Sequence, residues 1–142
     1  MMISPYEIVS KSALPALRAM VAKRLREDYH MTQQEVAKRL GVTQASISNY
    51  ARKTRGMMVN LEGDTTVSKA ADNIARELSS EDSDERETLR SMTNVLDYIR
   101  FNHMMCTLHS ELEPGFRVEG CYACDGALSG KDFGNLKILV GR

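Results

Sequence analysis

Apolar residues recur every three or four positions along most of this chain, which is the spacing of helices that bury one face. A short turn or helix is expected at 5–10, and a long helix follows from about Ala13 to Tyr29. Pro15 falls in the first turn of that helix, where proline is tolerated. A further helix is predicted over 65–78. The buried stripes of these two helices are Leu14, Leu17, Val21 and Leu25, and then Val67, Ala70, Ala71, Ile74, Ala75 and Leu78.

The last strong stripe predicts a helix over 85–110, with a cap at Ser83 or Asp84. Its apolar positions alternate three and four apart, as in a coiled coil, at Leu89, Met92, Leu96, Ile99, His103 and Cys106. The seam is too short to establish a coiled coil. Packing on the preceding helix and a contact between two chains both remain open.

Residues 32–50 have the spacing of two short helices joined by a tight turn. Gly41 permits the positive backbone angle that ends the first helix, and Thr43 caps the second. The predicted buried positions are Val36, Ala37, Leu40, Val42, Ile47 and Tyr50. The exposed face of the second helix then carries short, neutral polar side chains, whereas a merely solvated helix would carry Glu and Lys. Such side chains suit the edges of DNA bases.

This span resembles the helix-turn-helix of phage repressors, which has a small residue at Ala37, a glycine at Gly41 and a β-branched residue at Ile47. The resemblance implies that Gln33 contacts a phosphate and braces Gln44, which reads adenine. Asn49 presents the same amide fork one turn later. The predicted DNA-binding residues are Gln33, Thr43, Gln44, Ala45, Ser46, Ser48, Asn49, Arg52, Lys53 and Arg55. The last three would grip the DNA backbone, although a solvated basic helix end explains each of them equally well.

The formal net charge is zero, but the charges are unevenly distributed. From Lys11 to Arg55 the chain has ten basic and three acidic residues, and from Glu62 to Asp125 it has six basic and fourteen acidic residues. A basic front half attracts phosphate, and an acidic back half is repelled by it. Double-stranded DNA is therefore the expected partner of the front half.

All three cysteines and two of the three histidines fall within 22 residues. The pairs Cys106–His109 and Cys121–Cys124 each have two residues between their members, which is the spacing of paired metal ligands. His103 is a rival to His109 as the fourth ligand. We expect one metal site per chain, with zinc preferred to an iron–sulfur cluster. A non-metal alternative is that Cys106 is a core residue and the spacing is a coincidence.

The predicted fold is mainly α: a five-helix repressor-like domain, extended by a long helix and a small Cys/His metal-binding ribbon in which 116–119 pairs with 135–140. We divide the chain into a DNA-binding domain (1–56), a linker (57–63), a helical dimerisation region (64–110) and a metal-binding tail (106–142). The chain has no apolar run of membrane-spanning length and no signal peptide, so a cytoplasmic protein with no membrane partner is expected.

The 43-residue block from Leu14 to Gly56, with the Cys/His tail, also resembles a group of predicted archaeal transcriptional regulators. We therefore predict a homodimeric, sequence-specific transcription regulator and not an enzyme. A bridging or coactivator protein that docks on the transcription machinery is the alternative. A toxin-neutralising DNA-binding partner and a metal-dependent enzyme are further possibilities.

Overall fold

The computed structural model describes residues 2–52 and 61–125 of the 142-residue chain, with the side chains of 51 and 52 left out of that description. These residues form helices and contain no strand, which confirms the mainly α prediction. In order along the chain, the elements are α1 (Pro5–Ile8), η1 (Val9–Ala13), α2 (Leu14–Glu27), α3 (Gln33–Leu40), α4 (Gln44–Arg52), α5 (Thr65–Ser79), α6 (Glu85–Phe101) and α7 (Cys106–Leu112).

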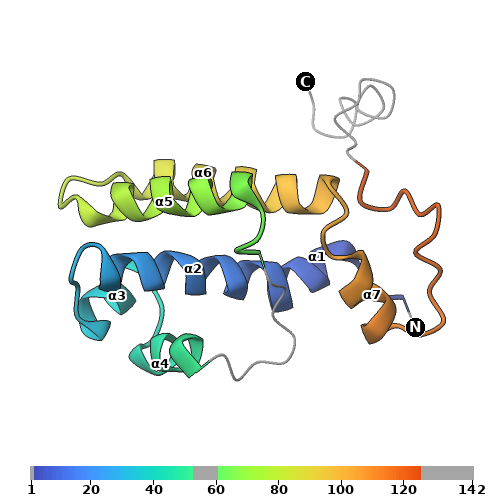
Figure 1. The fold of residues 1–142 in the computed structure, drawn as a ribbon, viewed down its shortest axis with the longest axis horizontal. Helices are drawn as coiled ribbons and strands as arrows, with labels where there is room; N and C mark the ends of the chain where they lie inside the picture. Colours follow the sequence, from blue (N-terminus) through green and yellow to red (C-terminus); the bar gives the residue numbers. More distant parts are fainter. Residues whose placement is uncertain (1, 53–60, 126–142) are drawn as a thin grey trace, which may run out of the picture.

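The segments α1, η1 and α2 run end to end as one rod through the middle of the molecule (Figure 1). The α3–α4 pair lies on one side of this rod, and the antiparallel α5–α6 hairpin lies on the other (Figure 1). Helix α2 contacts α3, α4 and α5, so one continuous core joins the two sides. The rod therefore holds α4 away from the acidic hairpin.

A widened turn joins the short helix α1 directly to α2, which begins at Leu14, next to the predicted start near Ala13. In η1 the N–H of Leu14 donates to the carbonyl of Val9, five residues back. The next residue, Pro15, has no N–H to donate, and its ring would crowd the carbonyl four residues before it in a regular helix. The wider π-type turn relieves that conflict. Ser12, buried in this turn, donates its hydroxyl to the carbonyl of Ile8 at 2.6 Å.

Helix α5 confirms its predicted stripe, because Val67, Ala71 and Ile74 are all buried in the common core. A mostly buried arginine also fixes α2 to this helix. The Arg24 guanidinium forms ion pairs with Asp72 and Glu62 and donates to the hydroxyl of Ser68 at 3.0 Å. Burial alone would lower the pKa of Arg24, but Asp72 and Glu62 outweigh it and raise the pKa above its usual value. This network joins the basic and acidic halves of the chain.

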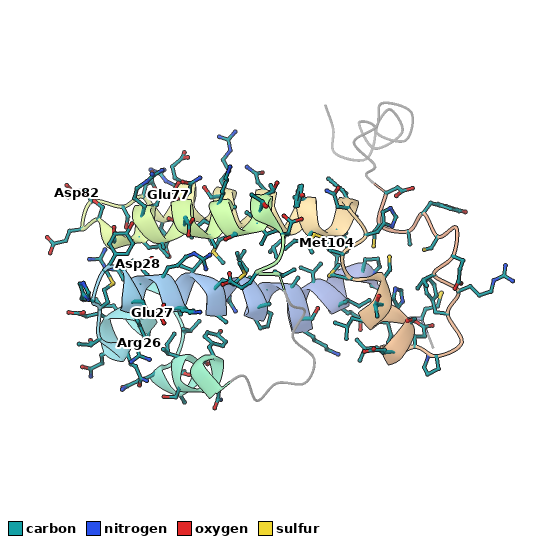
Figure 2. All side chains as sticks on the ribbon, in the orientation of Figure 1. Arg26, Glu27, Asp28, Glu77, Asp82 and Met104 are labelled. Atoms are coloured by element: carbon teal, nitrogen blue, oxygen red, sulfur yellow. The ribbon has the colours of Figure 1, made fainter. Side chains whose placement is uncertain are left out.

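The helix predicted over 85–110 is not continuous. Asp84 caps α6 as expected, by accepting from the N–H of Arg86. The helix then ends at Phe101, and His103 takes a left-handed backbone conformation with φ of 56°. Met104 lies in the turn that follows and packs against the core on the side facing the N-terminal rod (Figure 2). Met105 of the same turn is buried in the core, and the turn separates Cys106, which begins α7, from the seam of α6.

The predicted two-stranded ribbon is not confirmed. Residues 116–119 form no strand, and their expected partner at 135–140 lies outside the described residues. The chain instead passes from α7 through turns to the cysteines at 121 and 124. Among the described helices, none combines the length and the hydropathy needed to cross a bilayer.

Candidate nucleic-acid interface

Two local devices set the start and the end of α3. At its start Thr32 and Glu35 cap each other: the Thr32 hydroxyl accepts from the Glu35 N–H at 3.2 Å, and the Glu35 carboxylate accepts from the Thr32 N–H at 2.8 Å. This reciprocal pair satisfies donors that a helix start leaves without partners. At its end Gly41 has φ of 67°, and the N–H of Val42 donates to the carbonyl of Ala37 at 3.0 Å. The predicted turn geometry is confirmed.

We expect Gly41→Ala to lower the free energy of unfolding by about 1–2 kcal/mol, because a Cβ disfavours the left-handed conformation. Apart from Gly41 and its two chain neighbours, no atom of the described residues lies within 4 Å of the Cβ position, so backbone strain produces the effect. Gly63→Ala is the matched control: its Cβ position is equally open, and its backbone lies outside the left-handed region. Urea unfolding of both variants measures the difference. Equal stability of the two would contradict a strained turn at Gly41.

Helix α4 is anchored by one cap and two buried side chains. The Thr43 hydroxyl accepts from the N–H of Ser46 at 3.1 Å, as predicted for the cap. On the inner face Ile47 is 1% exposed and Tyr50 is 8% exposed, so both are buried against α2 and α3. Because these side chains point inward, the opposite face of α4 faces solvent.

The predicted base-reading residues lie on or beside that outer face. Thr43, Gln44 and Ala45 are exposed. Ser46, Ser48 and Asn49 are half-buried, because they flank the inner face. The predicted backbone contacts cannot be placed, since the side chains of Arg52, Lys53 and Arg55 lie outside the described residues.

The first glutamine has a different partner from the one that the resemblance implied. The Gln33 side-chain carbonyl accepts from the Ser48 hydroxyl at 3.2 Å and so links the start of α3 to the middle of α4. No hydrogen bond joins Gln33 to Gln44 among the described residues. The link orients the two helices relative to each other and leaves the Gln44 amide exposed to solvent.

The electrostatic surroundings separate this face from the acidic half. The α5–α6 hairpin lies across α2 from α4, and Asp82 projects from its tip (Figures 1 and 2). Arg39 of α3 donates to the carbonyl of Ser80 at 2.6 Å, which turns this cation toward the hairpin. Helix α2 therefore lies between α4 and the acidic hairpin, and the tip of the hairpin contacts α3 through Arg39.

Residues 23–56 match a family described as helix-turn-helix, and the match spans the end of α2, the whole α3–α4 pair and the residues just after α4. This segment is a helix-turn-helix. The match supports a role in DNA binding and transcription regulation. Searches of the curated proteins and of the solved structures found no significant match. The likeness to archaeal regulators stays a prediction.

A second cluster lies at the far end of the rod from the helix-turn-helix. All three cysteines are free thiols. Together with His103 and His109 they line one small cavity. Its other lining residues are Ile8, Met105, Phe116 and Val118. Burial raises the pKa of the Cys106 thiol, and the nearby Cys121 and Asp125 raise it further. Burial likewise raises the pKa of Cys124, with Cys106 as the next cause.

The two candidate histidines occupy different environments. His103 is 41% exposed, with Nδ1 3.7 Å from the Cys106 sulfur and Nε2 2.7 Å from the Asp125 carboxylate. His109 is buried, with Nε2 3.4 Å from the Glu113 carboxylate. Its ring stacks on Phe116, with the ring centroids 4.0 Å apart. The structure therefore pairs Cys106 with His103 more closely than with His109.

The sequence reasoning missed two acidic partners of these histidines. Asp125 directly follows Cys124, and Glu113 is one helical turn after His109, so the spacing could have indicated both. As the side chains are placed, no group of three or more His, Cys, Asp or Glu residues within 2–52 and 61–125 is arranged to hold a metal. The metal site accordingly stays a prediction.

Proposed function

We propose that this protein is a sequence-specific, DNA-binding transcription regulator that reads base edges with the outer face of α4. One observation carries the proposal. The helix-turn-helix buries Ile47 and Tyr50 on the inner side of the second helix. It leaves polar side chains on the exposed side, and Gln44 is the first of them along the helix. A helix that enters the major groove needs this division between a packed face and a polar reading face.

Gln44 is the proposed centre of the readout. It lies in the first turn of α4, and the N-terminal residues of a recognition helix come nearest to the bases. Its amide offers one donor and one acceptor, which match the N7 and N6 groups of adenine in the major groove. Asn49, half-buried and further along α4, supplies a second amide of the same kind.

Gln33 and Ser48 act in this proposal as a support for α4. Their 3.2 Å hydrogen bond fixes the angle between α3 and α4. The Gln33 side-chain nitrogen is then the group that remains to donate to a phosphate, while its oxygen is occupied by Ser48. This arrangement positions the helix on the DNA backbone, and Gln44 provides the choice of base.

We further propose that the regulator is a homodimer and that its tail carries one metal site. Regulators of this kind bind two half-sites about one helical turn apart, which requires two recognition helices related by a two-fold axis. The metal site is supported by the convergence of the three thiols on one cavity.

Selection from a pool of random DNA duplexes tests the proposed function. We expect a palindromic consensus whose half-site centres lie about 10 base pairs apart, containing adenine at a position that depends on Gln44. Sedimentation with the selected duplex should give two chains per duplex. A pool that yields no consensus would overturn the proposal and favour the protein-docking alternative.

A further inference from the structure

We infer that the tail binds a single divalent metal ion of the zinc type through Cys106, Cys121, Cys124 and His103. The inference rests on the proposed metal-bearing tail, and it replaces His109 with His103 as the nitrogen ligand. It also assigns a role to Asp125, the carboxylate partner of the His103 ring.

The Cys106–His103 pair already has the separation of two ligands of one ion. The distance from the His103 Nδ1 to the Cys106 sulfur is 3.7 Å. In a tetrahedral zinc site with the usual metal–sulfur and metal–nitrogen bond lengths, a sulfur and a nitrogen ligand lie about 3.6 Å apart. An ion could therefore bind both atoms with little change in either side chain.

Asp125 orients the His103 ring through a hydrogen bond, as carboxylates commonly do for metal-bound histidines. Its carboxylate lies 2.7 Å from Nε2, so the ring donates its Nε2–H to the carboxylate and directs the Nδ1 lone pair toward Cys106. Metal-bound histidines commonly donate their second ring nitrogen to a carboxylate in this way. The left-handed backbone at His103, with φ of 56°, is a strained conformation of the kind that concentrates at functional sites.

His109 has a packing role, because its ring contacts Glu113 and Phe116. Its Nε2 faces Glu113, and the Glu113 carboxylate also accepts from the N–H of Ile3 at 2.9 Å. With the ring stacked on Phe116, His109 joins α7 to the start of the chain and to the following loop. Among the described residues no hydrogen bond joins His109 to a cysteine sulfur, whereas the Cys106 sulfur lies 3.7 Å from the His103 Nδ1.

The Cys121–Cys124 turn supplies the two remaining sulfurs. Both cysteines line the same cavity as Cys106, and the N–H of Ala123 donates to the Cys121 sulfur at 3.4 Å. Full coordination needs these two side chains to close onto the Cys106–His103 pair, because the described side chains do not yet form a three-ligand group. Metal binding would then fix the loop after α7 in place.

Cobalt titration of the reduced, metal-free full-length chain tests this assignment. Tetrahedral Co²⁺ bound by thiolates gives intense visible d–d bands and sulfur-to-metal charge-transfer bands, whereas the hydrated ion absorbs only weakly in the visible. We expect one Co²⁺ per chain, with spectra typical of three sulfurs and one nitrogen and with all three thiols protected from a thiol reagent. His103→Ala should weaken binding by at least about tenfold and alter the bands, and Asp125→Asn should weaken it by about tenfold.

Two control variants separate the histidines. His109→Gln and His30→Ala should each leave the cobalt affinity within about threefold of the native value, because neither residue is a ligand. Circular dichroism of each variant confirms that it is folded. Loss of binding in His109→Gln with native binding in His103→Ala would overturn the assignment. Native protein that binds no Co²⁺, or that is purified without oxygen carrying an iron–sulfur spectrum, would also overturn it.

The result of the cobalt titration can be interpreted independently of the result of the DNA selection. A failed cobalt titration together with a clear DNA consensus would reject the metal site and leave the proposed readout standing. A good cobalt site in a chain that selects no consensus would support the ligand assignment and reject the proposed readout.

Discussion

Truncation of the α4 anchor, Ile47→Ala, is expected to lower the free energy of unfolding by about 2–5 kcal/mol. Ile47 is 1% exposed, so its removed atoms leave a cavity between α4 and the helices behind it. Small domains have only about 5–15 kcal/mol of stability, so the loss is a large fraction of the total. DNA affinity should fall with it, since an unanchored α4 cannot present Gln44 at a fixed angle. Chemical unfolding and a duplex-binding titration measure the two effects.

Leu89→Ala is the matched control for this truncation. Leu89 is also a large aliphatic residue on a helix, but it is 58% exposed on α6. Its truncation should change stability by less than about 0.5 kcal/mol, as for most surface substitutions. Equal losses from Ile47→Ala and Leu89→Ala would show that α4 is not fixed by the core as described.

Removal of the proposed reading amide, Gln44→Ala, is expected to cost about 1–3 kcal/mol of binding to the selected duplex, or roughly 5- to 150-fold in affinity. The Gln44 side chain is exposed and is not part of the core, so stability should remain near the native value. Affinity for unrelated duplexes should hardly change, because phosphate contacts supply that binding. The difference in affinity between the native protein and Gln44→Ala should also disappear when the adenine of the consensus is replaced. Binding titrations with a set of duplexes that carry single base-pair substitutions measure this difference.

Asn94→Ala provides the control for loss of an amide. Asn94 is exposed on α6, on the far side of α2 from the helix-turn-helix, so its truncation should leave every duplex affinity unchanged. If Gln44→Ala bound all duplexes with native preference, Gln44 would not be the reading residue. If both variants lost affinity equally, the interface would not be confined to α4.

The helix-turn-helix could be predicted because short-range interactions determine it. The left-handed turn at Gly41 and the Thr43 cap depend on neighbours within a few residues, and the three-residue spacing of Ile47 and Tyr50 marks the buried face of α4. The structure confirms all of these features. The Gln33 contact is different. Its link to Ser48 depends on how α3 and α4 cross, and spacing along one helix does not determine that.

The path of the chain at both ends of the rod depends on long-range packing. Periodicity alone did not show that Pro15 would be accommodated by a widened turn inside one continuous rod. Periodicity also did not predict the left-handed turn at His103, which follows α6 and directs α7 toward the N-terminus. The apolar spacing continues through Cys106 and so predicts one helix. The structure shows that this helix is divided into α6 and α7.

The preference for His109 over His103 followed from that error. On an uninterrupted helix Cys106 and His109 would share a face, and three-residue spacing favours them as a pair. With the helix divided at 102–105, His103 turns back toward Cys106 and His109 packs under Phe116. The proposed change of ligand from His109 to His103, the rival named in the sequence analysis, therefore rests on a local break in the backbone.

Backbone amide NMR of the full chain with the selected duplex is the most direct test of where DNA binds. The largest chemical-shift changes should fall at the start of α3 and along the outer face of α4, around Gln33, Gln44 and Asn49. The α5–α6 hairpin, across α2 from that face, should remain close to its free spectrum (Figure 1). Changes concentrated on α5 and α6, with α4 unaffected, would contradict the assignment of α4 as the DNA-reading helix.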